Sequence, residues 1–125
     1  MTELPVANPT GLRVLLVEDQ MIVAMVIEDM LRDLGCVVVG PAGTLESAVR
    51  LAREEELDAA ILDVNLDGQK VFPAAEELLT RRIPFIFATG YGEQILPEKW
   101  HGLRRLAKPF NREQLEELIR SISSN

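Results

Sequence analysis

The chain has 125 residues, of which 47% are hydrophobic and 26% charged, a composition typical of one globular domain with its own core. Acidic residues outnumber basic ones by 20 to 13, and the net charge of −7 argues against direct binding of nucleic acid, although the arginine doublets Arg81-Arg82 and Arg104-Arg105 allow local basic patches. No apolar run approaches the ~18 residues of a membrane span, no secretory signal precedes the domain and the single Cys36 cannot form an internal disulfide, so we expect a cytoplasmic protein.

The first third of the chain predicts a strand, a helix and a second strand. Residues 1–10, with Pro5 and Pro9, are expected to form a flexible tail, and residues 11–125 a single domain. Leu12–Val17 predicts a strand, and Met21 to Leu34 predicts a helix that Gly35 ends in the left-handed conformation. The apolar side chains spaced to form the buried face of this helix are Ile22, Val26, Met30 and Leu34.

The alternation continues with a strand at Cys36–Gly40 and a turn over residues 41–43. Thr44 is suited to cap the next helix, whose apolar stripe contains Leu45, Ala48, Val49 and Ala52. A third strand is predicted at Leu57–Leu62.

The second half of the chain repeats the pattern after a loop at Asp63–Lys70, in which Asp67-Gly68 predicts a turn. Pro84 belongs at the start of a strand, Pro97 limits any helix around it to a short one, and Asn111 with Gln114 forms a capping-box variant. The predicted elements are a helix at Val71–Arg82, a strand at Ile83–Ala88, a short helix between Glu93 and Trp100, a strand at Leu103–Ala107 and a final helix after Asn111.

Short strands that alternate with helices predict right-handed crossovers and a parallel sheet covered on both faces. The chain is therefore expected to adopt an α/β fold, a flavodoxin-like (βα)5 doubly wound sheet with strand order 2-1-3-4-5. The last helix ends near the C-terminus, so we expect no attached output domain.

Polar side chains follow four of the five predicted strands at the point where each strand ends. They are Glu18-Asp19, Asp63, Thr89 and Lys108. Because the carboxyl ends of parallel strands lie along one edge of the sheet, we expect these groups to converge at the edge where such folds bind ligands. Three carboxylates, a hydroxyl and an ammonium in one cleft indicate a site for a divalent cation and a phosphoryl group.

Each of these residue types has a chemical role in such a site. Asp63, expected at an exposed edge, can attack phosphorus and form an acyl phosphate, provided that a metal screens its charge. Glu18 and Asp19 would supply oxygen ligands for Mg²⁺, and Asn65 would add its backbone carbonyl. Lys108 and the Thr89 hydroxyl would contact phosphoryl oxygens and respond to the new charge.

The chain resembles the receiver domain of two-component response regulators from Leu12 to about Ile122. The matching motifs are Val17-Glu18-Asp19, Leu62-Asp63-Val64-Asn65, Ala88-Thr89-Gly90 and Lys108-Pro109-Phe110. The segment Phe87-Ala88-Thr89-Gly90-Tyr91-Gly92 is similar to the FATGUY group of single-domain response regulators.

The resemblance implies that Asp63 accepts a phosphoryl group from a sensor histidine kinase, of the HWE type by analogy, or from a histidine phosphotransferase. It implies Mg²⁺ held by Asp19, Asp63 and the Asn65 carbonyl, with Glu18 assisting. Where the family has a switching aromatic residue three positions before the lysine, this chain has Arg105. Tyr91, two residues after Thr89, is a substitute candidate for the switch, alongside Thr89 and Arg105 themselves.

The preferred interpretation is a stand-alone receiver that acts in a phosphorelay through phosphorylation-dependent contacts with an unknown downstream protein. It is not an enzyme beyond catalysing its own Mg²⁺-dependent phosphorylation and dephosphorylation, and a weak dimer through the fifth strand and last helix stays open. The alternative is a small Mg²⁺-dependent phosphatase of the haloacid-dehalogenase type, which would require a second aspartate where Asn65 stands. A flavodoxin is discounted because Glu18-Asp19 would repel the flavin phosphate.

Overall fold

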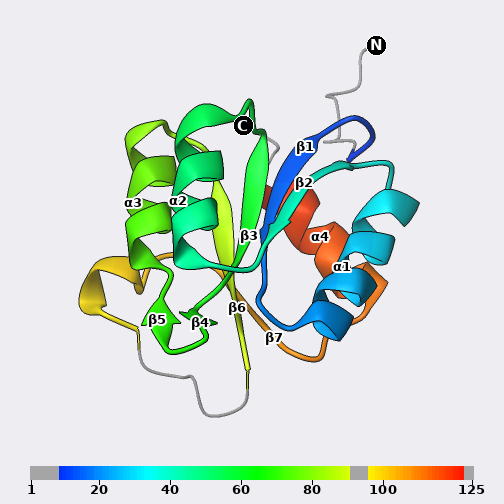
Figure 1. Ribbon diagram of the computed structural model, residues 1–125. Helices are drawn as coiled ribbons and strands as arrows, with labels where there is room; N and C mark the ends of the chain where they lie inside the picture. Colours follow the sequence, from blue (N-terminus) through cyan, green and yellow to red (C-terminus); the bar gives the residue numbers. More distant parts are fainter. Residues whose placement is uncertain (1–8, 91–95, 123–125) are drawn as a thin grey trace.

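The computed structural model, which describes residues 9–90 and 96–122, contains a five-stranded parallel sheet (Figure 1). Its strands lie in the order β2-β1-β3-β6-β7. Numbered by their sequence within this sheet, the strands follow the order 2-1-3-4-5, which confirms the predicted flavodoxin-like fold. The sheet strands are Arg13–Val17 (β1), Val37–Ala42 (β2), Ala59–Asp63 (β3), Phe85–Thr89 (β6) and Arg105–Ala107 (β7).

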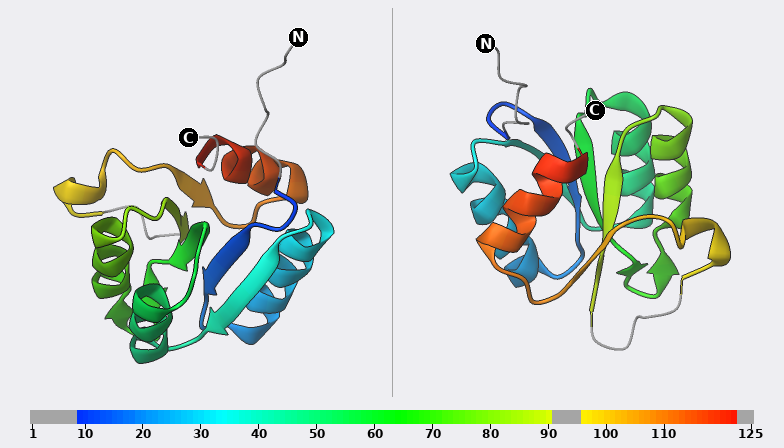
Figure 2. Two further views of the ribbon diagram at one scale, coloured as in Figure 1. Left: turned by 90° about the horizontal axis from the view of Figure 1, so that it is seen from above. Right: turned by 180° about the vertical axis from the view of Figure 1, so that it is seen from behind.

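Helices cover both faces of the sheet (Figure 2). The described helices are Met21–Asp33 (α1), Leu45–Glu54 (α2), Phe72–Thr80 (α3) and Arg112–Ile122 (α4), together with a 3₁₀-helix at Glu98–Trp100 (η1). Helices α2 and α3 and the side chain of Trp100 pack on one face, and α1 and α4 pack on the other. The sheet is therefore buried between two hydrophobic cores, as expected for parallel strands.

The helix ends follow the sequence signals. The Thr44 side chain accepts a hydrogen bond from the backbone N–H of Ser47, 3.1 Å away, and so caps α2. At the start of α4, the Gln114 side chain accepts from the Asn111 N–H and the Asn111 side chain accepts from the Gln114 N–H, both at 2.8 Å. Gly35 ends α1 with φ +89°, the left-handed conformation that glycine adopts without strain.

The prediction for the buried face of α1 is wrong in the first half of the helix, although Met30 and Leu34 are partly buried and pack against the core as predicted. Its buried residues are Ala24, Ile27 and Leu31, whereas Ile22 and Val26 are 77% and 48% exposed. Both rows have helical spacing, and the row with the smaller residue Ala24 packs on the sheet because a small side chain allows close approach. The other row leaves an apolar surface on α1, extended by the exposed side chains of Met21 and Met25.

Three elements differ from the sequence prediction in detail. Strand β2 extends to Ala42, through two residues that were predicted to form a turn. The loop after β3 folds into a small antiparallel hairpin of Asn65–Leu66 (β4) and Gln69–Lys70 (β5), which the sequence indicated only as a turn at Asp67-Gly68. Among the described residues between β6 and β7 there is only the 3₁₀-helix η1, which begins directly after Pro97 as the sequence predicted for a short helix. Tyr91 and the residues up to 95 lie outside the described part of the chain.

The segment expected to be a tail is described only from Pro9. Pro9 is buried, and its carbonyl lies 3.4 Å from the Cys36 Sγ, which donates to it. Burial raises the pKa of this thiol. Cys36 is thus a structural residue that helps fix the start of the domain.

No helix in the described ranges is long and apolar enough to cross a membrane.

The two rows of α1 can be told apart by stability measurements. Ile27→Ala is expected to lower the free energy of unfolding by about 2–5 kcal/mol, because it opens a cavity beneath the helix. Ile22→Ala, the same change on the exposed row, is expected to alter it by less than about 0.5 kcal/mol. Urea unfolding followed by circular dichroism measures both, and equal losses would contradict the assignment of the buried face.

Candidate metal and phosphoryl site

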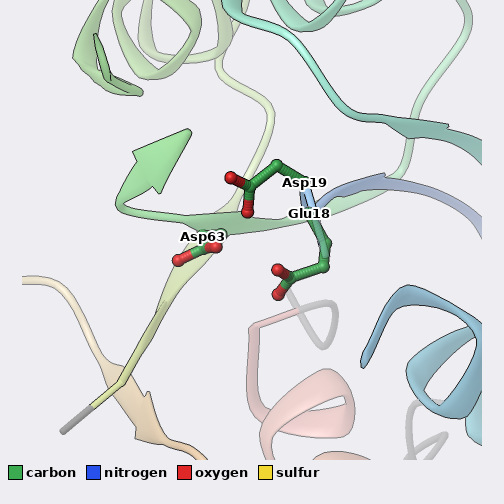
Figure 3. A group of neighbouring side chains, drawn as sticks. All are labelled: Glu18, Asp19 and Asp63. Carbon is green, nitrogen blue, oxygen red and sulfur yellow. The ribbon is translucent and has the colours of Figure 1, made fainter. Parts of the chain in front are cut away.

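Three acidic side chains converge at the carboxyl ends of β1 and β3 (Figure 3). Glu18 and Asp19 directly follow β1, and Asp63 is the last residue of β3. Because Val17 pairs with Leu62 in the sheet, the two strand ends are level. One oxygen from each of the three carboxylates lies within 4.8 Å of the others, as predicted for these three acidic residues.

Two of the three carboxylates are buried. Glu18 is 3% and Asp63 4% exposed, so the expectation that Asp63 would be exposed is wrong. Asp63 is still part of the central strand β3, which lies between β1 and β6, and it pairs with Ala88 of β6. A buried carboxylate requires a compensating cation or hydrogen bonds.

Lys108 supplies positive charge to this cluster. Its Nζ lies 2.9 Å from Glu18 Oε1 and 3.5 Å from Asp63 Oδ2. The Lys108 backbone N–H donates to the Thr89 carbonyl at 2.8 Å, which fixes the lysine at the end of β7. Burial lowers the pKa of Lys108, but the hydrogen bond to Glu18 and the charges of Asp63 and Glu18 outweigh it, so that the pKa lies above its ordinary value.

The β4–β5 hairpin closes over the same cluster. The backbone N–H of Asp67 donates to Asp19 Oδ2 at 2.8 Å. Asp67 and Gly68 have φ of +51° and +90°, the signs required in a two-residue hairpin turn. This contact is not visible in the sequence, because a backbone donor leaves no side-chain signature; the Asp-Gly pair is the available signal for the turn.

Asn65, the first residue of β4, lines the cavity beside the carboxylates. Its side-chain Oδ1 is buried and accepts no hydrogen bond from the described residues. A buried amide oxygen without a donor is rare in folded proteins and indicates a position where a ligand or ion completes the contacts. The oxygens of Asn65, Asp19 and Asp63 are the donor types that Mg²⁺ prefers, so the residues present fit this ion.

Asp19 and Asp63 of the cluster line a cavity of about 730 Å³ that extends onto the exposed row of α1. Its polar lining includes Asp63, Asp19 and Lys108. Its apolar part contains Ile22, Val23, Val26, Ile27, Met30, Pro109 and Phe110. The site therefore combines a cluster of carboxylates suited to binding a cation with an adjoining hydrophobic surface.

Two of the other residues predicted for the site, Thr89 and Arg105, do not line this cavity. Thr89 ends β6 and is partly buried, but it does not line the cavity, whereas the following Gly90 does. Arg105 is exposed on β7 and pairs with Phe87 across the sheet. Tyr91 lies outside the described residues.

Comparisons with known proteins agree with this geometry. The family model of the response regulator receiver domain matches residues 14–120. The chain is 34% identical over 114 residues to the transcriptional regulatory protein PdtaR of Mycobacterium tuberculosis. The aligned region covers 88% of this chain and 54% of PdtaR. It is 36% identical over 110 residues to the phyllosphere-induced regulator PhyR of Methylorubrum extorquens, covering 85% of this chain and 41% of PhyR. The chain thus spans about half the length of the curated relatives it matches.

Solved structures show the same similarity. The solution structure of SdrG from Sphingomonas melonis superposes with a TM-score of 0.80 at 35% identity, covering 91% of this chain and 97% of SdrG. The receiver domain of the sensor histidine kinase PA1611 from Pseudomonas aeruginosa, which has a magnesium ion coordinated in its active-site cleft, gives a TM-score of 0.77 at 30% identity over 93% of this chain and all of that domain. With the acidic cluster, the lysine and the sheet order in place, the chain belongs to the family of response regulator receiver domains, which are signalling modules of two-component systems rather than catalytic enzymes.

Proposed function

We propose that this receiver accepts a phosphoryl group on Asp63 from a phosphohistidine and passes the signal on by protein contact. The observation that carries the proposal is the convergence of Asp63 with two further carboxylates and Lys108 at one end of the sheet. In the reaction, an Asp63 carboxylate oxygen forms a bond to phosphorus while the P–N bond of the donor breaks. The electron pair of that bond leaves with the imidazole nitrogen, and Asp63 becomes an acyl phosphate.

Mg²⁺ is the cofactor that the proposed reaction needs. Asp19, Asp63 and the backbone carbonyl of Asn65 would hold the ion, with Glu18 assisting; the spacing of the three carboxylates supports this choice. When bound, the ion screens the negative charge that opposes approach of a phosphoryl donor. Lys108 meanwhile keeps its ammonium protonated at neutral pH, since its pKa is raised, and can neutralise a phosphoryl oxygen.

The response to phosphorylation is proposed to run through Thr89 and Lys108. The Lys108 N–H already donates a hydrogen bond to the Thr89 carbonyl. A displacement of either residue is therefore expected to move the ends of β6 and β7 together. The added charge near −2 attracts the Thr89 hydroxyl and the Lys108 ammonium. Arg105, on β7 three positions before Lys108, and Tyr91 are the proposed replacements for the missing aromatic switch.

The partner proposed to deliver the phosphoryl group is a sensor histidine kinase, for example of the HWE type, or a histidine phosphotransferase. The exposed apolar row of α1 adjoins the phosphoryl cavity, so a helical donor domain can bury Ile22 and Val26 while presenting its histidine to Asp63. A downstream protein, or a second copy meeting at β7 and α4, would bind elsewhere on the domain. The phosphatase alternative loses its support, because the family match and the similarity to SdrG describe a signalling regulator.

Phosphorylation of Asp63 is testable by intact mass. Incubation with acetyl phosphate and Mg²⁺ is expected to add the mass of one phosphoryl group to the parent chain, and to add nothing after Asp63→Asn or with EDTA present. Asp67→Asn is the matched control, because Asp67 lines the same cavity and should leave the mass gain intact. The site assignment fails if Asp63→Asn gains the phosphoryl mass as the parent does.

Binding of Mg²⁺ is testable by thermal unfolding. Saturating the site at about 100 times the dissociation constant should stabilise the parent by about 2.7 kcal/mol. Asp19→Asn is expected to remove most of this gain and to raise the melting temperature without metal, since it relieves repulsion among the three carboxylates.

Asp29→Asn, an exposed acidic position on α1, serves as the control and should keep the full Mg²⁺ effect. A Mg²⁺-dependent gain that survives Asp19→Asn would place the ion elsewhere.

A further inference from the structure

A second cavity, of about 620 Å³, lies at the end of the sheet opposite the phosphoryl site. It is formed where α3 ends, β6 begins and α4 ends, at the edge away from the β4–β5 hairpin (Figures 1 and 2). Its volume is within the range of about 300–1,000 Å³ common for ligand pockets. The receiver chemistry described above uses none of its residues.

The walls of this cavity are largely apolar. They are formed by Leu12, Leu79, Ile83, Pro84, Phe85, Leu103 and Ile122. Leu79 is 47% exposed although it lies beside buried Ile83 and Phe85, so part of the apolar wall faces solvent. An apolar wall with a few polar groups at its rim is typical of sites that bind a ligand or a peptide segment.

Two arginines lie at the rim, one from each of the basic doublets in the sequence. Arg82 and Arg104 are exposed, and among the described residues neither side chain forms an ion pair or a hydrogen bond. The adjacent Arg81 differs, because its guanidinium donates to the Ala52 carbonyl at 2.6 Å and helps fix α2 to α3. Asp58, whose carboxylate also lines the cavity, accepts a hydrogen bond from the Arg13 backbone N–H at 2.8 Å.

Arg82 also has a backbone conformation that is unfavourable for a residue with a side chain. Its φ is +60°, at the turn that ends α3, where glycine or asparagine is the usual residue. Among the described residues, Asp67 is the other non-glycine residue with positive φ, and it lies at the phosphoryl site. A residue kept in a strained conformation where glycine would be more stable is a reason to look for a function of its side chain.

We propose that this cavity binds a short acidic segment of a protein partner, with an apolar side chain against Leu79 and Phe85 and flanking carboxylates on Arg82 and Arg104. Charge complementarity carries the choice of occupant: two arginines without internal partners flank an apolar wall on a chain whose net charge is −7. Exposed Arg–carboxylate pairs add modest affinity, so the complex is weak and depends on salt. The proposal is independent of phosphorylation, since none of its residues belongs to the phosphoryl site.

The test uses the full chain labelled with ¹⁵N and two fluorescent ten-residue peptides. One peptide alternates leucine with glutamate, and the other has lysine in place of every glutamate. The acidic peptide is expected to shift the amide signals of residues 79–85 and 102–104 and to raise its fluorescence anisotropy on binding, whereas the lysine peptide should do neither. Raising the salt from 50 to 300 mM should weaken the binding of the acidic peptide.

Three variants separate the role of the arginines from a loss of folding. Arg82→Gly should stabilise the turn while weakening peptide binding by about twofold to fivefold, a combination that a purely structural role would not produce. Arg104→Gln should weaken binding to a similar extent, and the two changes together by about tenfold. Arg50→Gln, an exposed arginine on α2 outside the cavity, is the matched control and should leave binding unchanged.

Several outcomes would overturn the proposal. They are equal binding of the lysine peptide, an equal loss in Arg50→Gln, or peptide-induced shifts confined to other surfaces. Concentration-dependent association of the chain alone that Arg82→Gly abolishes would assign the cavity to a second copy instead. Binding to vesicles of anionic phospholipid without binding to the acidic peptide would assign it to a membrane surface.

Discussion

The structure depends on keeping three carboxylates together at the end of a buried sheet. Two unit charges about 4 Å apart interact with about 4 kcal/mol at an effective dielectric constant of about 20, so Glu18, Asp19 and Asp63 repel one another strongly in the absence of a cation. Lys108 offsets part of this repulsion through Glu18 and Asp63, and the Asp67 N–H stabilises Asp19. The fold withstands the remaining repulsion among the carboxylates because the two hydrophobic cores on either side of the sheet hold the strand ends in place.

Register is what converts a parallel sheet into this site. Val17 pairs with Leu62, Asp63 with Ala88 and Thr89 with Ala107, so each polar residue of the site lies within two positions of a residue paired in the sheet. A slip by one residue in any strand would turn its side chains to the opposite face of the sheet. The apolar residues that fix the register, such as Leu62 and Ala88, therefore position the chemistry although they take no part in it.

The sequence predicted the sheet order and the acidic convergence because both follow from strand ends, which are marked by abrupt changes from apolar to polar residues. It failed on α1, where two apolar rows have helical spacing and the pattern cannot say which one meets the sheet. Ile22 and Val26 are larger than Ala24, so a size-weighted pattern favours the wrong row. The burial of Asp63 and the contact from the Asp67 N–H were also missed, since both arise from the fold around the residue and neither from its neighbours in sequence.

The two ends of the sheet carry opposite chemistry, and the net charge of the chain conceals this. Carboxylates gather at the carboxyl ends of the strands, while Arg82 and Arg104 lie together at the amino ends of β6 and β7. Helix α3 contributes to the second arrangement, because its C-terminus carries partial negative charge and favours arginines directly after it. That effect accounts for a basic residue at either position 81 or 82; it does not account for a left-handed arginine at 82, where glycine would satisfy the turn at lower cost. The side chain of Arg82 is therefore the feature of this end of the molecule that folding alone leaves unexplained.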